Sequence, residues 1–257
     1  SLHDALPISG TGLLQLASTS PNGATVADIS ALGYGLRNLA AGEQVSLSVN
    51  QGMLNVTGPI SSNGSEVRLS ADRMAINASV NTGSNTAGQV NITPWTHANA
   101  VHLGSTADTT AATLELSGTE LAQMTTGMIR IGSSGHSGGI TIKDSLTIAP
   151  AAAGGLSLIN KGNISQDTGK TLTVSNLNAD ASDPGNVLGG SVNLFEANNA
   201  IGMVAGRAGR AGAGSSFTVQ SNLPLQVGAV DTNAGVLLGT GGIITIHKIG
   251  RASCRER

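Results

Sequence analysis

The fold is decided by the stretch QVSLSVN, residues 44–50, in which Val45, Leu47 and Val49 alternate with small polar residues. Successive side chains of an extended chain point to opposite faces, so the three aliphatic residues share one face of a strand. The polar residues between them face the other way. The stretch therefore predicts a short strand with one buried face and one solvated face.

The same alternation recurs along most of the chain, separated by clusters of Gly, Asn, Asp and Ser that favour turns. Further instances are EVRLS (66–70), MAINA (74–78), QVNIT (89–93), TLELS (113–117), GITIK (139–143), GLSLI (155–159), TLTVS (171–175), SVNLF (191–195) and SFTVQ (216–220). The main strands begin their aliphatic series at Val45, Val67, Val90 and Leu114, and then at Ile140, Leu156, Leu172, Val192 and Phe217. A loose period of roughly 20 residues predicts a repeat architecture.

Two or three short strands in each period favour an all-β chain folded as a parallel β-solenoid with a narrow aliphatic core. We expect about twelve coils of roughly 20 residues and a rod roughly 58 Å long, since neighbouring strands lie about 4.8 Å apart. The inward ladders should include Ile140, Ile142, Leu156, Leu158, Leu172 and Val174. A sandwich of hairpins is the alternative, and it is disfavoured because two-residue Asn-Gly or Asp-Gly connections between strands are scarce.

The solenoid pattern covers residues 44–248, and residues 9–43 form a poorly patterned start of the same solenoid. Within that start, VADISALGYGLRNLA (26–40) fits either a short helix or a poorly patterned coil of the solenoid. Ser117 and Glu120 have the spacing of a capping box. We therefore expect ELAQM, which begins at Glu120, to form one helical turn that protrudes from the rod.

The two ends of the sequence lack the alternating strands and the turns rich in Gly, Asn, Thr and Ser that the rest of the chain shows. One DNA string encodes residues 1–8 while its reverse complement encodes residues 249–255, a coincidence that chance rarely produces. We therefore expect residues 1–8 and 249–257 to be translated sequencing adapter and leave them out of the fold. Cys254 lies in this tail, so the rest of the chain contains no cysteine for disulfides, zinc–thiolate sites or thiol catalysis.

The composition narrows the class of protein. The sequence has 36 glycines in 257 residues, 2% aromatic residues and 11% charged residues, whereas charged residues make up about a quarter of ordinary globular domains. This mix disfavours a closely packed α/β enzyme. With 39% hydrophobic residues and a net charge of -2, the chain is too apolar for disorder and lacks a basic footprint for nucleic acid. No apolar run is long enough to span a bilayer.

No group of residues has the pattern of an active site, so we expect no catalytic, cofactor-binding or metal-binding residue, no cofactor and no enzymatic activity. Asp180 and Asp183 come nearest to a cation site, but the surrounding letters NADASDPG fit a turn. The stretch GRAGRAGAGSS (206–216) lacks the Lys-Ser/Thr ending of a P-loop. We expect a mobile surface loop there, whose Arg207 and Arg210 are available to an anionic surface.

The remaining polar features fit an ordinary surface. Histidines without metal-ligand spacing, expected on the surface or in loops, are His97, His102, His136 and His247. Sequons, which occur about as often as chance gives, begin at Asn55, Asn63, Asn77, Asn91 and Asn163. Trp95 lies in a turn between two strands and is expected to cover the rod rather than to hold a ligand.

The part of the chain from Glu66 to Gly132 contains EVRLSADRMAINASVN (66–81), QVNITP (89–94), AVHLG (100–104) and LELSGTELAQMTTGMIRIGS (114–133). Through these residues it resembles the filamentous haemagglutinin-like large exoproteins of Gram-negative bacteria. Within them, TELAQMTTGMIRIG is fairly specific to that group. The Gly/Asn/Thr texture of the remaining chain is shared with many autotransporter passengers.

The resemblance implies a right-handed parallel β-helix that is secreted to the bacterial cell surface by two-partner secretion through an outer-membrane pore-forming partner. It implies a structural stalk that acts in adhesion or biofilm formation, with a host-cell or glycan surface as a further partner and no nucleic acid or membrane-spanning part. A chain that passes unfolded through a narrow pore is better without disulfides, which agrees with the lack of cysteine before residue 249. The alternatives are the shaft of an autotransporter passenger, the shaft of a contact-dependent toxin, and a solenoid polysaccharide lyase or hydrolase, which is disfavoured because the carboxylates are scattered.

Overall fold

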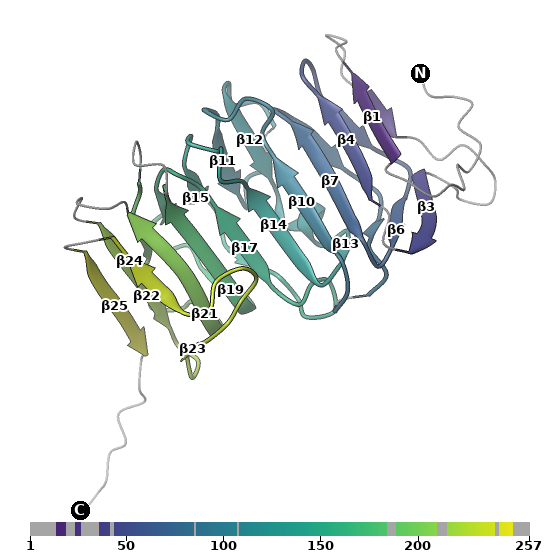
Figure 1. The fold of residues 1–257 in the computed structure, drawn as a ribbon. Helices are drawn as coiled ribbons and strands as arrows, with labels where there is room; N and C mark the ends of the chain where they lie inside the picture. Colours follow the sequence, from purple (N-terminus) through teal and green to yellow (C-terminus); the bar gives the residue numbers. More distant parts are fainter. Residues whose placement is uncertain are drawn as a thin grey trace, which may run out of the picture.

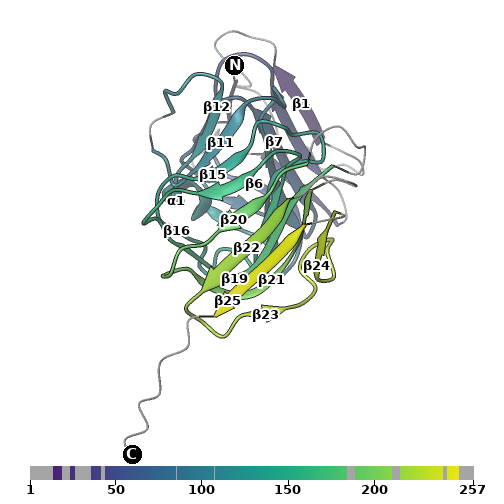
Figure 2. The same ribbon diagram turned by 90° about the vertical axis from the view of Figure 1, so that its left-hand side faces the viewer.

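A computed structural model (Figures 1 and 2) describes residues 14–18, 24–26, 36–41 and 44–248, apart from 85, 107, 184–188, 210–214 and 240–241. The ends expected to derive from adapter, residues 1–8 and 249–257, lie outside the described residues. The described strands stack side by side along one elongated body, with β1 near one end and β25 at the other (Figure 1).

The described strands form four sheets. The large sheet contains, in order along its main path, β1 (Leu14–Ser18), β4 (Val45–Val49), β7 (Glu66–Ala71), β10 (Gln89–Thr93), β14 (Met128–Gly132), β17 (Leu156–Ile159), β19 (Leu172–Ser182), β21 (Ala200–Gly209) and β23 (Gln226–Val227). Beside this path, β16 (Leu146–Thr147) pairs with β19 and β24 (Val236–Leu238) pairs with β21. The second sheet contains β12 (Thr113–Leu116), β11 (Ala100–Leu103), β15 (Ile140–Ile142), β18 (Ile164–Gln166), β20 (Val192–Leu194), β22 (Ser216–Ser221) and β25 (Ile243–Lys248).

Two smaller sheets complete the body. The third sheet contains β13 (Met124–Thr125), β9 (Val80–Asn81), β6 (Ile60–Asn63) and β3 (Leu36–Ala41), and the fourth contains β2 (Ala24–Val26), β5 (Leu54–Val56) and β8 (Met74–Ile76). Every pairing between these named strands is parallel. Figure 2 views the body from the β25 end, with β11, β15 and β20 of the second sheet toward the left and β1, β7 and β24 of the large sheet toward the right. The chain is therefore all-β with long parallel sheets, as the alternation predicts.

The inward side chains stack in register through the sheets. In the large sheet one such ladder runs through Leu47, Leu69, Ile92, Ile131, Leu158 and Ala179. In the second sheet another runs through Val101, Ile140, Ile164, Val192 and Phe217. All of these side chains are buried and belong to one continuous apolar cluster. The six residues expected to face inward, from Ile140 to Val174, are buried as well, which confirms the alternation at those positions.

The pairing of strands differs from the simple period in two places. Val45 pairs with Val67 and Val67 with Val90, as expected, but Val90 then pairs with Ile129 rather than with Leu114. Leu114 instead pairs with Val101 in the second sheet. The reason is that the chain between β10 and β14 forms β11, β12, a helical turn and β13 before it returns to the large sheet. The step from Val90 to Leu114 therefore joins two different sheets.

The shorter steps that begin at Ile140 do not connect paired residues. Ile140 pairs with Ile164 in the second sheet, whereas Leu156 pairs with Ile129 and Leu177 in the large sheet. Leu172 also lies in the large sheet, but it pairs with Leu146 of β16 rather than with Leu156. Among these described positions, the longer step from Val192 to Phe217 is the one that connects paired residues.

Residues 21–43 contain β2 and β3, in a part where the sequence allowed either a short helix or a poorly patterned coil of the solenoid. β2 pairs with β5 and β3 pairs with β6, the latter with a register shift between Asn38 and Ala41. Residues 27–35 lie outside the described residues. Both described pieces are therefore strands, paired in parallel with strands that follow in the sequence, and not helix.

The predicted capping box is present, but the helical turn it begins does not protrude. The helix α1 spans Gly118–Leu121, with the Ser117 side chain accepting from Glu120 N and the Glu120 carboxylate accepting from Ser117 N. Leu121 is buried, and Glu120 Oε1 accepts a hydrogen bond from Ile76 N of β8 at 3.0 Å. β8 is an edge strand of the fourth sheet. The carboxylate therefore partners a backbone N–H of that edge, which holds α1 against the body.

Candidate functional site

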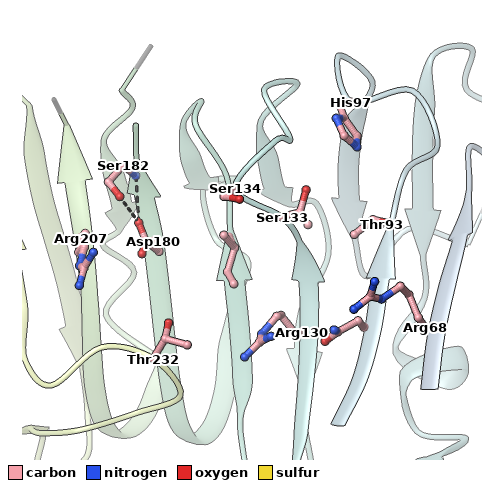
Figure 3. Close-up of a pocket in the computed structure, with 13 residues that line it drawn as sticks. Arg68, Thr93, His97, Arg130, Ser133, Ser134, Asp180, Ser182, Arg207 and Thr232 are labelled. Carbon is pink, nitrogen blue, oxygen red and sulfur yellow. Dashed lines mark hydrogen bonds between the residues drawn. The ribbon is translucent and has the colours of Figure 1, made fainter. Parts of the chain in front are cut away.

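The outer face of the large sheet carries a polar groove of about 530 Å³ (Figure 3). Its floor consists of residues that alternate with the buried ladder, so they point away from the core. Strand residues that line it are Arg68, Asn91, Thr93, Arg130, Gly132, Ile159, Asp180, Ser182 and Arg207, and turn residues that line it are His97, Ser133, Ser134 and Thr232. The groove crosses the strands from β7 to β21.

Two of the three groove arginines are paired with carboxylates. Arg68 donates to both oxygens of Glu66, with its Nη2 atom at 2.9 Å from Oε1 and 3.0 Å from Oε2. Asn91 donates from Nδ2 to the same Glu66 Oε1. Arg130 donates to Asp231, from Nε to Oδ2 at 3.0 Å and also from Nη2 to Oδ1. These forked contacts fix the directions of both guanidinium groups.

Arg207 differs from the other two. It lies on β21 opposite Asp180 of β19 in the strand register, and its side chain is exposed. The Asp180 carboxylate accepts from Ser182 and from Asn233 Nδ2, the latter at 3.1 Å. Within the described part of the chain, the Arg207 guanidinium has no hydrogen-bond or ion-pair partner. Its five N–H donors are therefore available to a ligand.

One wall of the groove is formed by residues 228–235, which we call the strap. The strap connects β23 to β24 and arches over the outer face of the large sheet (Figure 1). Its Asp231 accepts from Arg130 and from Ser157 Oγ at 2.6 Å, and its Asn233 donates to Asn178 Oδ1 at 2.8 Å. Ser157 and Asn178 are completely buried beneath it. Alternation predicts that these two polar residues face solvent, and the strap is the reason that they do not.

The two aspartates considered as a cation site have separate environments. Asp180 lies within β19 rather than in a turn, because β19 continues to Ser182 alongside β21. Asp183 is 2% exposed and pairs with Lys161, whose Nζ lies 3.5 Å from Oδ1. No group of three or more histidine, cysteine, aspartate or glutamate side chains that could hold a metal occurs in the described residues.

The glycine-rich stretch expected to form a loop is partly strand. Residues 206–209 belong to β21 and pair with residues 179–182 of β19, so this part of the stretch is strand and not loop. Gly206 N also donates to Gly235 O at 2.9 Å, which ties the end of the strap to this strand. Arg210 lies outside the described residues. Arg207 is thereby held on a rigid sheet rather than on a loop.

The histidines occupy four different environments. His97 is exposed and lines the groove, and its backbone carbonyl accepts from Ser137 N at 2.8 Å. His136 is completely buried, contrary to expectation: its Nε2 atom lies 2.8 Å from Asn99 O, and burial lowers the pKa of its imidazole. Burial, followed by the charge of Lys143, lowers the pKa of His102. His247 stacks on Phe195 with ring centroids 6.0 Å apart.

A second polar cluster, which the sequence analysis missed, lies in the loop between β11 and β12. Burial alone would raise the pKa of Glu115, but hydrogen bonds from Ser105 and from the N–H groups of Thr109 and Thr110 outweigh it and hold the pKa below its ordinary value. Burial and the charges of Glu120 and Glu115 raise the pKa of Asp108 to about 6. The side chains of this cluster, from Ser105 to Glu120, are brought next to one another only by folding.

The remaining surface features agree in part with expectation. Trp95 is 46% exposed in the turn that follows β10, between the groove residues Thr93 and His97. Asn91 begins a sequon but is buried in the groove floor and bonded to Glu66, so it is unavailable for glycosylation in the folded chain. Among the described residues, no helix is both long enough and apolar enough to cross a bilayer.

The chain was compared with protein families, curated proteins and solved structures. No family model, no curated protein and no solved structure matches the chain.

Proposed function

We propose that the chain is part of the stalk of a secreted bacterial surface adhesin of the filamentous haemagglutinin type. In this proposal the parallel sheets are the faces of a right-handed β-helix, with about twelve coils of roughly 20 residues each. The observation that carries it is the register of the large sheet, where inward aliphatic positions stack from Leu47 to Ala179. Such stacking makes each coil support the next, so the body can extend by repetition.

The chemistry of the described surface supports a structural role over catalysis. Glycoside hydrolysis uses a pair of carboxyl groups that flank the scissile bond. Among the residues that line the groove, Asp180 is the one carboxylate, and its oxygens already accept from Ser182 and Asn233. A solenoid hydrolase is therefore the weaker alternative.

The export route rests on the resemblance carried by residues 114–133. In this proposal an outer-membrane pore protein exports the chain to the cell surface, where it acts in adhesion or biofilm formation. The autotransporter and toxin-shaft alternatives use the same rod and differ in what is attached to it. Neither alternative is favoured by a further contact in the fold.

The experiment that tests the proposal is a protease-accessibility assay on intact cells of the source bacterium, with and without the neighbouring pore-protein gene. We expect the chain to be digested on intact cells and to be retained inside when that gene is deleted. A chain that stays surface-exposed after the deletion, or that is joined to its own barrel, supports the autotransporter route instead. Turnover of any polysaccharide by the purified chain would contradict the structural role.

A further inference from the structure

We propose that the groove on the large sheet binds an acidic oligosaccharide of the uronate type, with Arg207 holding a carboxylate of the ligand. The proposal goes beyond the stalk function and does not depend on it, because a rod with an unused groove would still be a stalk. The argument uses the charge balance, the lining and the shape of the groove.

The charge balance selects a ligand with few charges. Arg68 is neutralised by Glu66 and Arg130 by Asp231, each through a forked contact. Within the described part of the chain Arg207 keeps its donors free, and a guanidinium fork matches the two oxygens of a carboxylate. Asp180 opposite Arg207 keeps the groove close to neutral overall. The groove therefore suits a ligand with at most one carboxylate on each sugar, one of them held by Arg207, rather than a densely sulfated polyanion.

The lining selects a polyhydroxylated ligand. Five hydroxyl side chains line the groove, from Thr93, Ser133, Ser134, Ser182 and Thr232. Ile159 is the one large apolar side chain among the lining residues. A peptide gains its affinity largely from apolar anchors in pockets, which this groove does not provide. Sugar hydroxyls, by contrast, both donate and accept, and they match a wall of hydroxyl, amide and guanidinium groups.

The floor contains an additional acceptor without a partner. Asn91 is 8% exposed, and its Oδ1 atom is buried with no hydrogen-bond partner, while its Nδ2 atom donates to Glu66. A buried polar atom without a partner costs free energy. Because this oxygen is closed to solvent, it fixes no ligand group, and the exposed hydroxyl and guanidinium groups of the lining carry the recognition.

The shape suits an extended chain of sugars. Figure 3 shows Arg207 and Arg68 at opposite sides of the groove, with Arg130 between them. Between β7 and β21 the sheet makes five successive pairings, a span of roughly 24 Å at about 4.8 Å for each pairing. Because the floor consists of paired strands and the strap is tied to Arg130 and Ser157, the site is rigid before the ligand arrives. Rigidity lowers the entropic cost of binding.

The test is a ligand-observed NMR titration of the full chain with four probes: tetragalacturonate, neutral maltotetraose, a heparin tetrasaccharide and tetraglutamate. Trp95, the one tryptophan in the sequence, gives a second readout because it lies between two groove residues. We expect tetragalacturonate to bind at least about tenfold more tightly than each of the other three probes. The variant R207Q should lose about tenfold in affinity and R207K less, since lysine keeps the charge but not the fork.

The matched control is R73Q, because Arg73 is an exposed arginine that does not line the groove. It should bind tetragalacturonate within a factor of about two of the unchanged chain. Thermal unfolding of R207Q should match that of the unchanged chain, since Arg207 has no partner in the described residues. Equal binding by R207Q, equal or tighter binding of the heparin or glutamate probe, or no binding up to about 10 mM would each overturn the proposal. None of these results bears on surface export.

Discussion

The large sheet and the second sheet have the same inner face and different outer faces. Inside, both stack aliphatic residues in register. Outside, the row of the second sheet that contains Glu115 and His102 continues into the small polar residues Thr141 and Ser165, whose hydroxyl oxygens lie 3.1 Å apart. The large sheet carries arginines, an aspartate and the strap at the corresponding positions. The inner face therefore specifies the fold, while the outer face can acquire a site where a distant segment covers it.

The largest expected effect is on the shared inner face. Ile142 of the second sheet is completely buried, in register with Leu103 and Gln166. The substitution Ile142→Asp places a carboxylate in the apolar core without a partner and should cost more than about 3 kcal/mol of unfolding free energy. A urea titration followed by circular dichroism measures it. A midpoint close to that of the unchanged chain would show that this face does not form the core.

The next effect concerns the strap, which distinguishes the two outer faces. Asp231→Ala leaves Arg130 and the buried Ser157 without their acceptor, and it should cost about 2 kcal/mol. Amide hydrogen exchange should become faster in residues 228–235 and unchanged in the second sheet. The control is Asp167→Ala, which removes a partly exposed ion pair with Lys143 and should cost at most about 1 kcal/mol. If both variants unfold at the same urea concentration, the strap does not stabilise the large sheet.

A smaller effect concerns the acidic loop beside the second sheet. The pKa of Asp108 is about 6 in the folded chain, raised from 3.8 mainly by burial. The folded state therefore holds this proton more tightly, so the stability it contributes is complete below pH 3.8 and is lost as the pH rises through about 6. Because the side chain is partly exposed, solvent screening reduces the effect to about 1 kcal/mol.

Asp108→Asn isolates this contribution. Asparagine tolerates the positive φ of 46° at this position, so the variant should unfold at a higher temperature than the unchanged chain at pH 7 and at the same temperature near pH 3.8. Thermal unfolding at several pH values measures the difference. Asp144→Asn is the control, because hydrogen bonds from Lys170 and Ser145 lower the pKa of that exposed carboxyl and predict the opposite sign. A pH-independent difference for Asp108→Asn would contradict the assignment.

The smallest effect is on the outer face of the second sheet. Thr141→Asp lies next to the most sensitive position, but its side chain is only half-buried and points away from the core. We expect a change within about 0.5 kcal/mol. The same urea titration as for Ile142→Asp measures it, which makes the two neighbours a matched pair. Equal sensitivity of the two positions would remove the distinction between inner and outer faces on which the comparison rests.

Particular residues show how far sequence reasoning reached. Val45, Val67 and Val90 were predicted to stack, and they do, because consecutive strands there follow one another at a regular spacing. Leu114 was expected to be next in that ladder and is not, because an inserted part of the chain adds strands to another sheet. The capping box at Ser117 was found because it is a local pattern of four residues. The burial of the turn that it begins depends on β8, which no local pattern reveals.

The groove was beyond the reach of sequence reasoning for a similar reason. Arg68, Arg130 and Arg207 are far apart in the sequence and were not recognised as one group, so the surface was interpreted as lacking clustered titratable residues. They share one face because their strands stack and because each occupies an outward position. No spacing rule of fixed period connects them, since the numbers of residues between stacked strands vary.

The amino-acid sequence was enough to indicate which aliphatic residues of the strands are buried and that the chain is all-β. Alternation has a period of two residues and depends only on the geometry of an extended chain, so it can be recognised without knowing any partner strand. The low aromatic content likewise indicates a narrow core filled by aliphatic side chains. Which strands are neighbours and which polar residues come together could be seen only in the folded chain. Arg130 and Asp231 are separated by 101 residues, and a contact of that kind depends on how all the strands between them stack.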